Sequence, residues 1–399
     1  MAKPKIALVP SAQGSKFYSV LPSSGVGDFD FTRSGSATRI NSQGLIETVG
    51  NGVSRLNYPL IDGKVVGCPS HILEPQSTNL ITYSENFSQW YIDGNQSSPT
   101  IISELNPDGS SQVYQINLNS GGNIYRTISI SSSIDYTFSV YIKGTGNGRL
   151  ILSNAQSTPE NYVDFTATSE WQRIELTGSS SSTSVRVAIG SWSNSSASGT
   201  IQIFGAQLEQ QSYATSYIPT NGSSVTRSAE TANGSGDAST FNDSEGVLMF
   251  EGGIPKDENV FRNISISDGS SNNFVTFYTT NSLNKITYLL GVGGQGAVFG
   301  LDYFFQDITI PFKIALVYSS GRNEIWVNGI KVNQNSNTFN LMSGLNQLSF
   351  DNGTGGGNWY GNTKQVQYYD SSLTDSELET LTSWVSFSDM ANGQLYSVE

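Results

Sequence analysis

Hydrophobic and polar residues alternate along many short runs of this chain, and the clearest run is YTFSVYIKG, residues 136–144. Tyr136 and Phe138 have one parity, whereas Thr137 and Ser139 have the other. Because successive side chains of a β-strand point to opposite sides of the sheet, this pattern predicts a strand with one buried face and one face open to water. Such patterning is typical of antiparallel sheets.

Similar runs recur on both sides of this segment. In the middle of the chain, we predict strands at residues 112–116, 124–130, 136–143, 149–152, 171–177, 184–189 and 200–208. Nearer the C-terminus, strand-like runs include GVLMFEGGI, NFVTFYTT, KITYLLGV, FKIALVYSS and NEIWVNGIKVN. Asn328 and Gly329 interrupt the last of these runs. Both residue types accept positive φ, so the sequence predicts a two-residue hairpin turn there.

Turn-rich stretches divide the chain into segments. Residues 1–80 contain only short apolar pieces between Gly, Pro and Asn turns, which predicts a small N-terminal β module. Residues 229–245, AETANGSGDASTFNDSE, predict a linker or a loosely packed crossing segment. We therefore expect one β-sandwich at residues 81–228, a second at residues 246–387 and a C-terminal tail at residues 388–399.

One short helix is expected near the C-terminus. Thr374 precedes Glu377 by three residues, which is the spacing of a capping box, and Leu378 and Leu381 supply an apolar stripe. Elsewhere the composition favours strands, because only 13% of the 399 residues are charged while Gly, Ser, Asn and Thr are plentiful. The predicted fold class is therefore all-β.

Charge and cysteine content exclude several classes of protein. The formal net charge is −13, and the 20 Lys and Arg residues never cluster, so we expect no nucleic-acid partner. Cys68 is the only cysteine, which excludes an intrachain disulfide and a cysteine zinc site. No apolar run approaches the ~18 residues of a membrane-spanning helix. We therefore expect a soluble chain, made in the cytoplasm, that does not insert into a membrane.

Catalytic motifs are absent or weak. A retaining glucanase needs two carboxylates ~5 Å apart, which on a strand are usually visible as a Glu-x-Asp-x-x-Glu run, and the chain has no such run. His71 is the only histidine, and Pro69 separates its neighbours Cys68 and Ser70, with no nucleophile elbow around them. The GVGGQG run at residues 291–296 precedes a strand-like segment rather than a helix, so it does not predict a dinucleotide site. We expect no enzymatic activity.

Charged residues in turns have two interpretations. Asp268, Asp351 and Asp370 lie near Asn residues, and their oxygen atoms suit a structural Ca²⁺, although ordinary turn hydrogen bonding is the favoured interpretation. No other cofactor is expected. Three arginines of the first segment are expected to pair with Glu47 or Glu74, or to bind carbonyl groups, rather than to bind a ligand: Arg33, Arg39 and Arg55.

Aromatic residues in polar loops are the candidate ligand-binding residues. Trp192 lies in GSWSNSSASG, and Trp359 and Tyr360 lie in GTGGGNWYGN, so each has few apolar neighbours in sequence. We expect these three side chains to be exposed, and at least one of the two loops to contribute to glycan or host-surface binding by stacking on a sugar, with an oligomer contact or loop anchoring as the alternative. Four tryptophans in apolar-patterned elements are expected to be packed instead: Trp90, Trp171, Trp326 and Trp384.

Several motifs resemble known families. FDFTRSGSATRINSQGLIETV and LEPQSTNLITYSENFSQW, residues 29–49 and 73–90, resemble a segment of fibre and spike proteins from tailed bacteriophages and prophages. The order ENFSQW, SVYIKG, WQRIEL, FGAQLE and SYIPT resembles jelly-roll carbohydrate-binding modules. FKIALVYSSGRNEIWVNGIKV resembles the central hairpins of concanavalin A-like and laminin-G-like jelly rolls.

These resemblances imply a setting and an architecture. The architecture is a small N-terminal β module followed by two antiparallel jelly-roll β-sandwiches and one short C-terminal helix. The setting is the virion, in which a head or tail fibre or spike is displayed outward, assembles as a homo-oligomer such as a trimer, and meets other phage virion proteins through its N-terminal region. Host cell-surface glycans are the implied ligands. Two alternatives stay open, namely a carbohydrate-active enzyme with binding modules and a structural decoration protein without a ligand.

Overall fold

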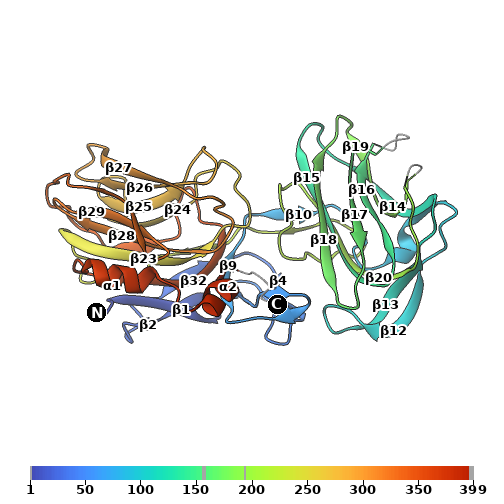
Figure 1. Ribbon diagram of the computed structural model, residues 1–399, viewed down its shortest axis with the longest axis horizontal. Helices are drawn as coiled ribbons and strands as arrows, with labels where there is room; N and C mark the ends of the chain where they lie inside the picture. The colour runs from blue at the N-terminus through green and yellow to red at the C-terminus, as the bar shows by residue number, and fades with distance from the viewer. Residues whose placement is uncertain (1, 155–158, 193–194, 395–399) are drawn as a thin grey trace.

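The structure is a computed structural model that describes residues 2–154, 159–192 and 195–394. The chain is nearly all β, as predicted, and it forms two lobes (Figure 1). The middle of the sequence builds one lobe, and both ends of the chain meet in the other (Figure 1). Residues 395–399 of the predicted C-terminal tail lie outside the described residues.

The middle lobe is a sandwich of two five-stranded antiparallel sheets. One sheet has the order β11 (Tyr91–Gly94), β14 (Gly122–Ser129), β19 (Ser184–Gly190), β16 (Asn147–Ser153) and β17 (Asn161–Thr166). The other has the order β12 (Thr100–Leu105), β13 (Ser111–Asn117), β20 (Thr200–Glu209), β15 (Asp135–Gly144) and β18 (Gln172–Ser179). Every strand predicted for this part of the chain overlaps one of these strands. Phe138, Val140 and Ile142 of β15 enter the core between the sheets, as their alternation predicts.

The opposite face of β15 differs from the prediction, because it is not open to water. Thr137 and Ser139 are both fully buried. The chain that follows β20 lies over them, and Thr137 Oγ1 donates a hydrogen bond to the carbonyl oxygen of Gln211 (2.9 Å). Arg173 donates to Ser139 Oγ from the neighbouring strand (2.9 Å). Polar side chains can therefore be buried on this face because each finds a hydrogen-bond partner.

The second lobe joins the N-terminal strands to the C-terminal sandwich. Its larger sheet has the order β22 (Thr231–Asn233), β3 (Phe29–Thr32), β2 (Lys16–Leu21), β1 (Ile6–Gln13), β32 (Gly361–Tyr369), β23 (Glu245–Gly253), β28 (Phe312–Ser319), β29 (Asn323–Val327) and β30 (Ile330–Asn335). To this sheet are added β9 (Ser70–Leu73), which pairs with β32, and β6 (Leu56–Asn57), which pairs with β9. The facing sheet has the order β27 (Ala297–Phe304), β26 (Lys285–Gly291), β25 (Phe274–Thr279), β24 (Asn263–Ser267) and β31 (Gln347–Ser349).

The first strands of the chain therefore do not form a sheet of their own. In β1, Ile6 lies opposite Tyr368 of β32, and both side chains are fully buried. A strand edge with unpaired backbone groups gains hydrogen bonds from any strand that completes it, whether near or far in sequence. The predicted N-terminal module thus shares its main sheet with the C-terminal sandwich.

The hairpin and helix predictions near the C-terminus are confirmed. Asn328 and Gly329 connect β29 to β30 with φ angles of 48° and 87°, as a two-residue turn of this kind requires. The predicted helix is α1 (Asp375–Thr382), in which the Thr374 side chain and the Glu377 side chain form the capping box. Leu378 packs against the outer face of the larger sheet. A second short helix, α2 (Phe387–Gly393), begins within the predicted second sandwich and runs into the predicted tail.

Three two-stranded sheets lie between the lobes or beside them. They are β4 (Ala37–Ile40) with β5 (Ile46–Val49), β7 (Leu60–Ile61) with β8 (Lys64–Val65), and β10 (Ser77–Asn79) with β21 (Val225–Arg227). Ile46 of β5 packs against Phe204 and Tyr217, so the N-terminal segment covers part of the outer face of the middle lobe. The predicted linker is not loosely packed, because β22 pairs with β3 and Glu230 is fully buried.

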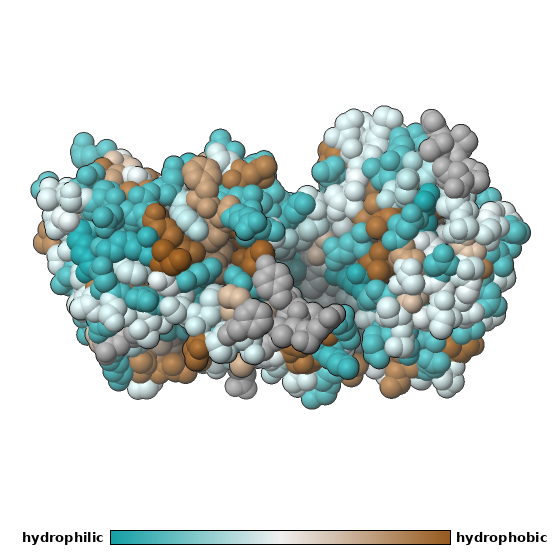
Figure 2. Space-filling view, viewed as in Figure 1, coloured by the Kyte–Doolittle hydropathy of each residue, from teal (hydrophilic) through white to brown (hydrophobic). Residues whose placement is uncertain are grey.

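The molecular surface is mostly polar on the face shown in Figure 2. Hydrophobic patches there are small and separated by hydrophilic residues, and a recess lies between the two lobes. Within the described residues, the helices are too short and too polar to cross a membrane.

Candidate functional site

A buried network of charged side chains joins the segments that meet at the junction of the lobes. Arg33 Nη1 donates to Glu230 Oε1 (2.8 Å), and Arg55 Nε donates to the same oxygen (2.8 Å). Arg55 also reaches Glu74 Oε2 (2.7 Å), and Arg227 lies 2.9 Å from that oxygen. Residues far apart in the sequence are thereby fixed to one another.

The charges in this network stabilise one another. Burial alone would raise the pKa of the Glu74 carboxyl, but Arg227 and Arg55, together with hydrogen bonds from Ser216, hold its pKa well below the usual range. Burial would lower the pKa of Arg55, but Glu230 and Glu74 raise it instead. Glu74 and Arg55 are therefore held in their charged forms at neutral pH.

The pairing predicted for the first arginines is confirmed. Arg39 bonds Glu47 (2.9 Å), Arg55 bonds Glu74, and Arg33 donates to the carbonyl oxygens of the 50–53 turn. Sequence reasoning missed Glu230, because that residue lies in a stretch with the composition of a linker. The only indication in the sequence that Glu230 is buried is its position directly before the short strand β22, and this indication is weak.

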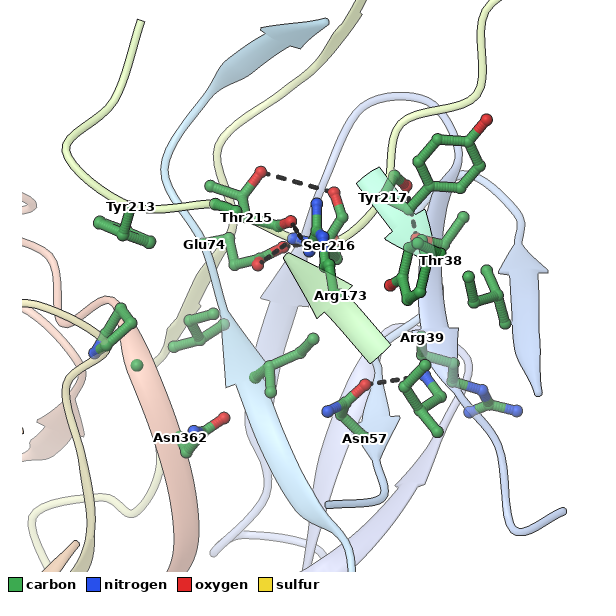
Figure 3. A pocket seen from close by; sticks show the side chains of 18 residues that line it. Thr38, Arg39, Asn57, Glu74, Arg173, Tyr213, Thr215, Ser216, Tyr217 and Asn362 are labelled. Atoms are coloured by element: carbon green, nitrogen blue, oxygen red, sulfur yellow. Dashed lines mark hydrogen bonds between the residues drawn. The ribbon is translucent and has the colours of Figure 1, made fainter. Parts of the chain in front are cut away.

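Two adjoining cavities form a groove beside this network. The smaller cavity has a volume of about 210 Å³ and the larger one about 610 Å³. Both are lined by Ile40, Asn57, Tyr141 and Arg173, which therefore form their common wall. Figure 3 shows the smaller cavity, with Glu74, Thr215 and Ser216 on one side and Thr38, Arg39 and Asn57 on another.

Aromatic side chains line the larger cavity. Trp171 is half-buried, and its indole Nε1 donates to the carbonyl oxygen of Leu105 (3.2 Å), which fixes the orientation of the ring. Tyr58 is half-buried too and lines the same cavity. The groove thus presents two partly accessible aromatic rings.

A glycine allows the two sides of the larger cavity to approach. Gly63 lies in the turn between β7 and β8 with a φ of 73°, and a Cβ atom there would lie 3.2 Å from Cβ of Glu170. A larger residue would strain the turn and push the hairpin away from the middle lobe. Gly63 therefore sets the width of the cavity at this end.

Polar side chains complete the groove. Asn57 Oδ1 accepts a hydrogen bond from the backbone N–H of Ile40 (2.8 Å), and Gln172 Nε2 donates to the carbonyl oxygen of Thr166 (3.0 Å). Among the described residues, no hydrogen bond engages the other amide atom of Asn57 or of Gln172. Arg173 donates to the carbonyl oxygen of Thr215 (2.7 Å) and stacks over Tyr141. The groove can therefore supply both donors and acceptors.

The expected exposure of the loop aromatic residues is wrong. Trp359 is 0% exposed and packs edge-on against Phe250 and Phe277, with ring centroids 5.0 and 5.6 Å apart. Tyr360 is only partly buried, but it packs against the same core. The ring of Trp359 is inserted between the two sheets, so it has no face available to a ligand.

Trp192 is also buried, with 7% of its surface exposed. It packs on Ile151 and Ala188 on the outer face of the middle lobe, so it lies in a different lobe from Trp359. Residues 193 and 194 of its loop lie outside the described residues. Of the four tryptophans expected to be packed, Trp90 and Trp326 are buried, whereas Trp171 and Trp384 are half-buried. Trp171 packs in part against the cluster that contains Ile46.

His71 and the three turn aspartates are held by contacts within the protein. Burial lowers the pKa of His71 to about 4, and its ring stacks on Phe17 at 3.9 Å. Asp268 accepts from the backbone N–H of Ser270 (2.9 Å). Asp351 accepts from that of Gly353 (2.6 Å), whereas Asp370 pairs with Lys5 (3.1 Å). In the described part of the chain, no three His, Cys, Asp or Glu side chains are grouped as a metal site would require.

Comparison with known proteins gives partial structural likenesses. No protein-family model and no curated protein sequence matches the chain. The CBM40 domain of the Ruminococcus gnavus IT-sialidase aligns with a TM-score of 0.31 and 19% identity, covering 36% of this chain and 86% of that one. Domain 4 of AbnA, a GH43 extracellular arabinanase from Geobacillus stearothermophilus, aligns with a TM-score of 0.31 and 12% identity, covering 39% and 73%. A structure described as CBM4 aligns with a TM-score of 0.25 and 14% identity, covering 35% and 97%.

Proposed function

We propose that this chain is a non-enzymatic carbohydrate-binding protein that holds a glycan in the groove between its lobes. The supporting observation is that one cavity is lined both by the aromatic rings of Trp171 and Tyr58 and by the amides of Asn57 and Gln172. Each of these amides has one atom that makes no hydrogen bond within the described residues. A sugar ring presents both C–H faces, which pack on aromatic rings, and hydroxyl groups, which need donors and acceptors. The cavity of about 610 Å³ also lies in the ~300–1,000 Å³ range of small-molecule sites.

The carboxylates of the groove favour binding over hydrolysis. Glycosidases use two carboxyl groups, ~5–5.5 Å apart in retaining enzymes and ~6.5–9.5 Å apart in inverting ones, and one of them must donate a proton. Glu74 is fixed in its charged form by two guanidinium groups, so it is unsuited to that role. Asp62 and Glu170 also line the larger cavity, and both are exposed. We therefore infer that the groove binds sugars without cleaving them.

The proposed setting is the virion of a tailed bacteriophage, where the chain serves as a fibre or spike protein. This part of the proposal rests on the resemblance of residues 29–49 and 73–90 to such proteins. Those segments contribute Arg33 and Glu74 to the junction network. A homo-oligomer such as a trimer on the particle surface would present several grooves to host-surface glycans at once.

Replacing the groove aromatics should weaken glycan binding. We expect Trp171→Ala and Tyr58→Ala each to lower affinity for host-surface polysaccharide roughly tenfold or more, because each removes an accessible ring from the groove. Tyr18→Ala is the matched control, because Tyr18 is an exposed tyrosine on β2 of the other lobe. Affinity electrophoresis in gels that contain the polysaccharide measures the change. Equal binding by all three variants would exclude the groove, and release of reducing sugar by the wild-type chain would contradict the non-enzymatic role.

The virion setting has its own test. Antibody against the purified chain should label the outer surface of phage particles induced from the source strain, and cryo-imaging should locate the label on the head or on the tail. Light scattering of the full-length chain at micromolar concentration should give the mass of a trimer. Particles without label, together with a monomer mass, would contradict this part of the proposal but leave glycan binding unaffected.

A further inference from the structure

Two rows of side chains cross the outer face of the β11–β14–β19–β16–β17 sheet. The strand registers place Tyr91 opposite Tyr125, Tyr125 opposite Ala188, Ala188 opposite Ile151, and Ile151 opposite Tyr162. These five residues form an unbroken row, one from each strand. With strands ~4.8 Å apart, the row is about 19 Å long, which suits an oligosaccharide rather than a single sugar.

The ends of this row are exposed, and its centre is covered by Trp192. Tyr91 and Tyr162 are 59% and 48% exposed, respectively. Trp192 packs over Ala188, Ile151 and Tyr125, so the centre is aromatic as well. An exposed tyrosine ring lacks the stabilisation that burial of its apolar surface would give. Exposed aromatic groups that lie together therefore indicate a binding surface.

A polar row runs parallel to the aromatic row. Each of its members lies two residues away from the aromatic row in the same strand and therefore on the same face of the sheet. It consists, strand by strand, of Asp93, Asn123, Gly190, Arg149 and Asp164. A cavity of about 480 Å³ opens at the Arg149 end, lined also by Ser195 and Ser196. An aromatic row beside a polar row offers a sugar chain both contacts that it needs, packing for its C–H faces and hydrogen bonds for its hydroxyls.

The charges of these rows are already paired. Arg149 makes two hydrogen bonds to Asp164 (2.7 and 3.1 Å) and stacks 3.6 Å above the ring of Tyr162. Arg186 bonds Asp93 (2.7 Å) across the ring of Tyr125. The two arginines and two aspartates of these pairs balance in charge, and Arg126 lies over the ring of Tyr91 at 5.8 Å, on a chain whose net charge is −13. The surface therefore suits an uncharged partner, because acidic polymers would be repelled by the chain as a whole.

Two buried polar atoms of the polar row remain without partners. Within the described residues, Arg149 Nη1 and Asn123 Oδ1 have no hydrogen bond, although both residues are more than nine-tenths buried. An unpaired buried polar group costs about 1–3 kcal/mol, so a structure usually retains one where something else completes it. Arg149 also lines the cavity at this end of the row.

We propose that the two rows form a second glycan-binding surface, which takes an extended, uncharged polysaccharide lying across the strands. The inference rests on the proposed function for its class of ligand, but it concerns different residues from the groove. The N-terminal segment packs on the opposite sheet of this lobe through Ile46.

The test compares variants of the two surfaces in the full-length chain. The double variant Tyr91→Ala/Tyr162→Ala should bind mannan, dextran, xylan or arabinan, whichever the wild type retains in affinity gels, at least tenfold more weakly. The variant Tyr162→Phe should bind normally because it keeps the ring, and Tyr18→Ala is the matched surface control. Raising the salt concentration should leave binding unchanged, because the paired rows carry no net charge.

The outcomes separate this inference from the proposed function. If Trp171→Ala loses binding while the double variant binds like the wild type, the groove is the glycan site and the rows are not. If the wild type binds none of the neutral polysaccharides and no host-surface polysaccharide, both proposals fail. A change of mass in light scattering without a change in glycan binding would show that the rows are an interface between copies, which also overturns the inference. Thermal unfolding confirms that each variant is folded.

Discussion

Glu230→Ala is expected to lower the free energy of unfolding by about 3–5 kcal/mol, because it removes one partner of a buried ion network. Glu230 accepts hydrogen bonds from both Arg33 and Arg55, and its side chain is fully buried. Without it, two guanidinium groups would stay in the interior with too little negative charge to balance them. Urea unfolding monitored by tryptophan fluorescence measures the loss.

The matched control is an ion pair on the surface. Arg39 and Glu47 form a hydrogen-bonded pair with partly exposed side chains, so Glu47→Ala should change stability by less than about 1 kcal/mol. Equal effects of the two substitutions would mean that the buried network has no special role. A much smaller loss for Glu230→Ala would mean that water enters the junction and solvates the arginines.

The same network gives the protein a defined sensitivity to acid. The pKa of Glu74 is lowered in the folded chain, so its contribution to stability is complete above the ordinary carboxyl pKa of about 4.3 and is lost as the pH falls below that value. Stability should therefore decline on acidification. The decline should be less steep in Glu74→Gln, although this variant starts from a lower stability at neutral pH.

Trp359→Ala should also destabilise the fold by about 3–5 kcal/mol, because it leaves a cavity between the sheets of the second lobe. The indole is fully buried against Phe250 and Phe277. Glycan binding should not change at temperatures where the variant is folded, since Trp359 lines neither cavity of the groove and lies in the other lobe from the two rows. Thermal unfolding and affinity electrophoresis measure the two effects separately.

Trp171→Ala provides the comparison for this second prediction. Trp171 is half-buried at the groove, so its removal should affect binding more than stability. If Trp359→Ala instead keeps its stability and loses binding, the loop of Trp359 opens in solution, and the buried position seen here is not the functional one.

Local sequence patterns determined the secondary structure of this protein. The alternation at residues 136–144 specified β15. The Asn328-Gly329 pair specified the hairpin between β29 and β30, because both positions need positive φ. The spacing of Thr374 and Glu377 specified the start of α1. These features depend on backbone preferences within a few residues, so a reader of the sequence alone can find them. The pairing of Arg39 with Glu47 was also accessible, because the two residues lie on adjacent strands of a short hairpin.

Only the tertiary structure decided which distant segments meet. The alignment of β1 with β32, and the burial of Glu230, depend on strand edges that any compatible strand can complete, so local sequence does not select the partner. The same reason explains the error at Trp359, whose Gly- and Asn-rich neighbours indicate a loop although its ring enters a core built by strands far away in sequence. The two rows on the middle lobe likewise arise from the registers of five strands. Register is a property of paired strands, and no single segment of the sequence contains it.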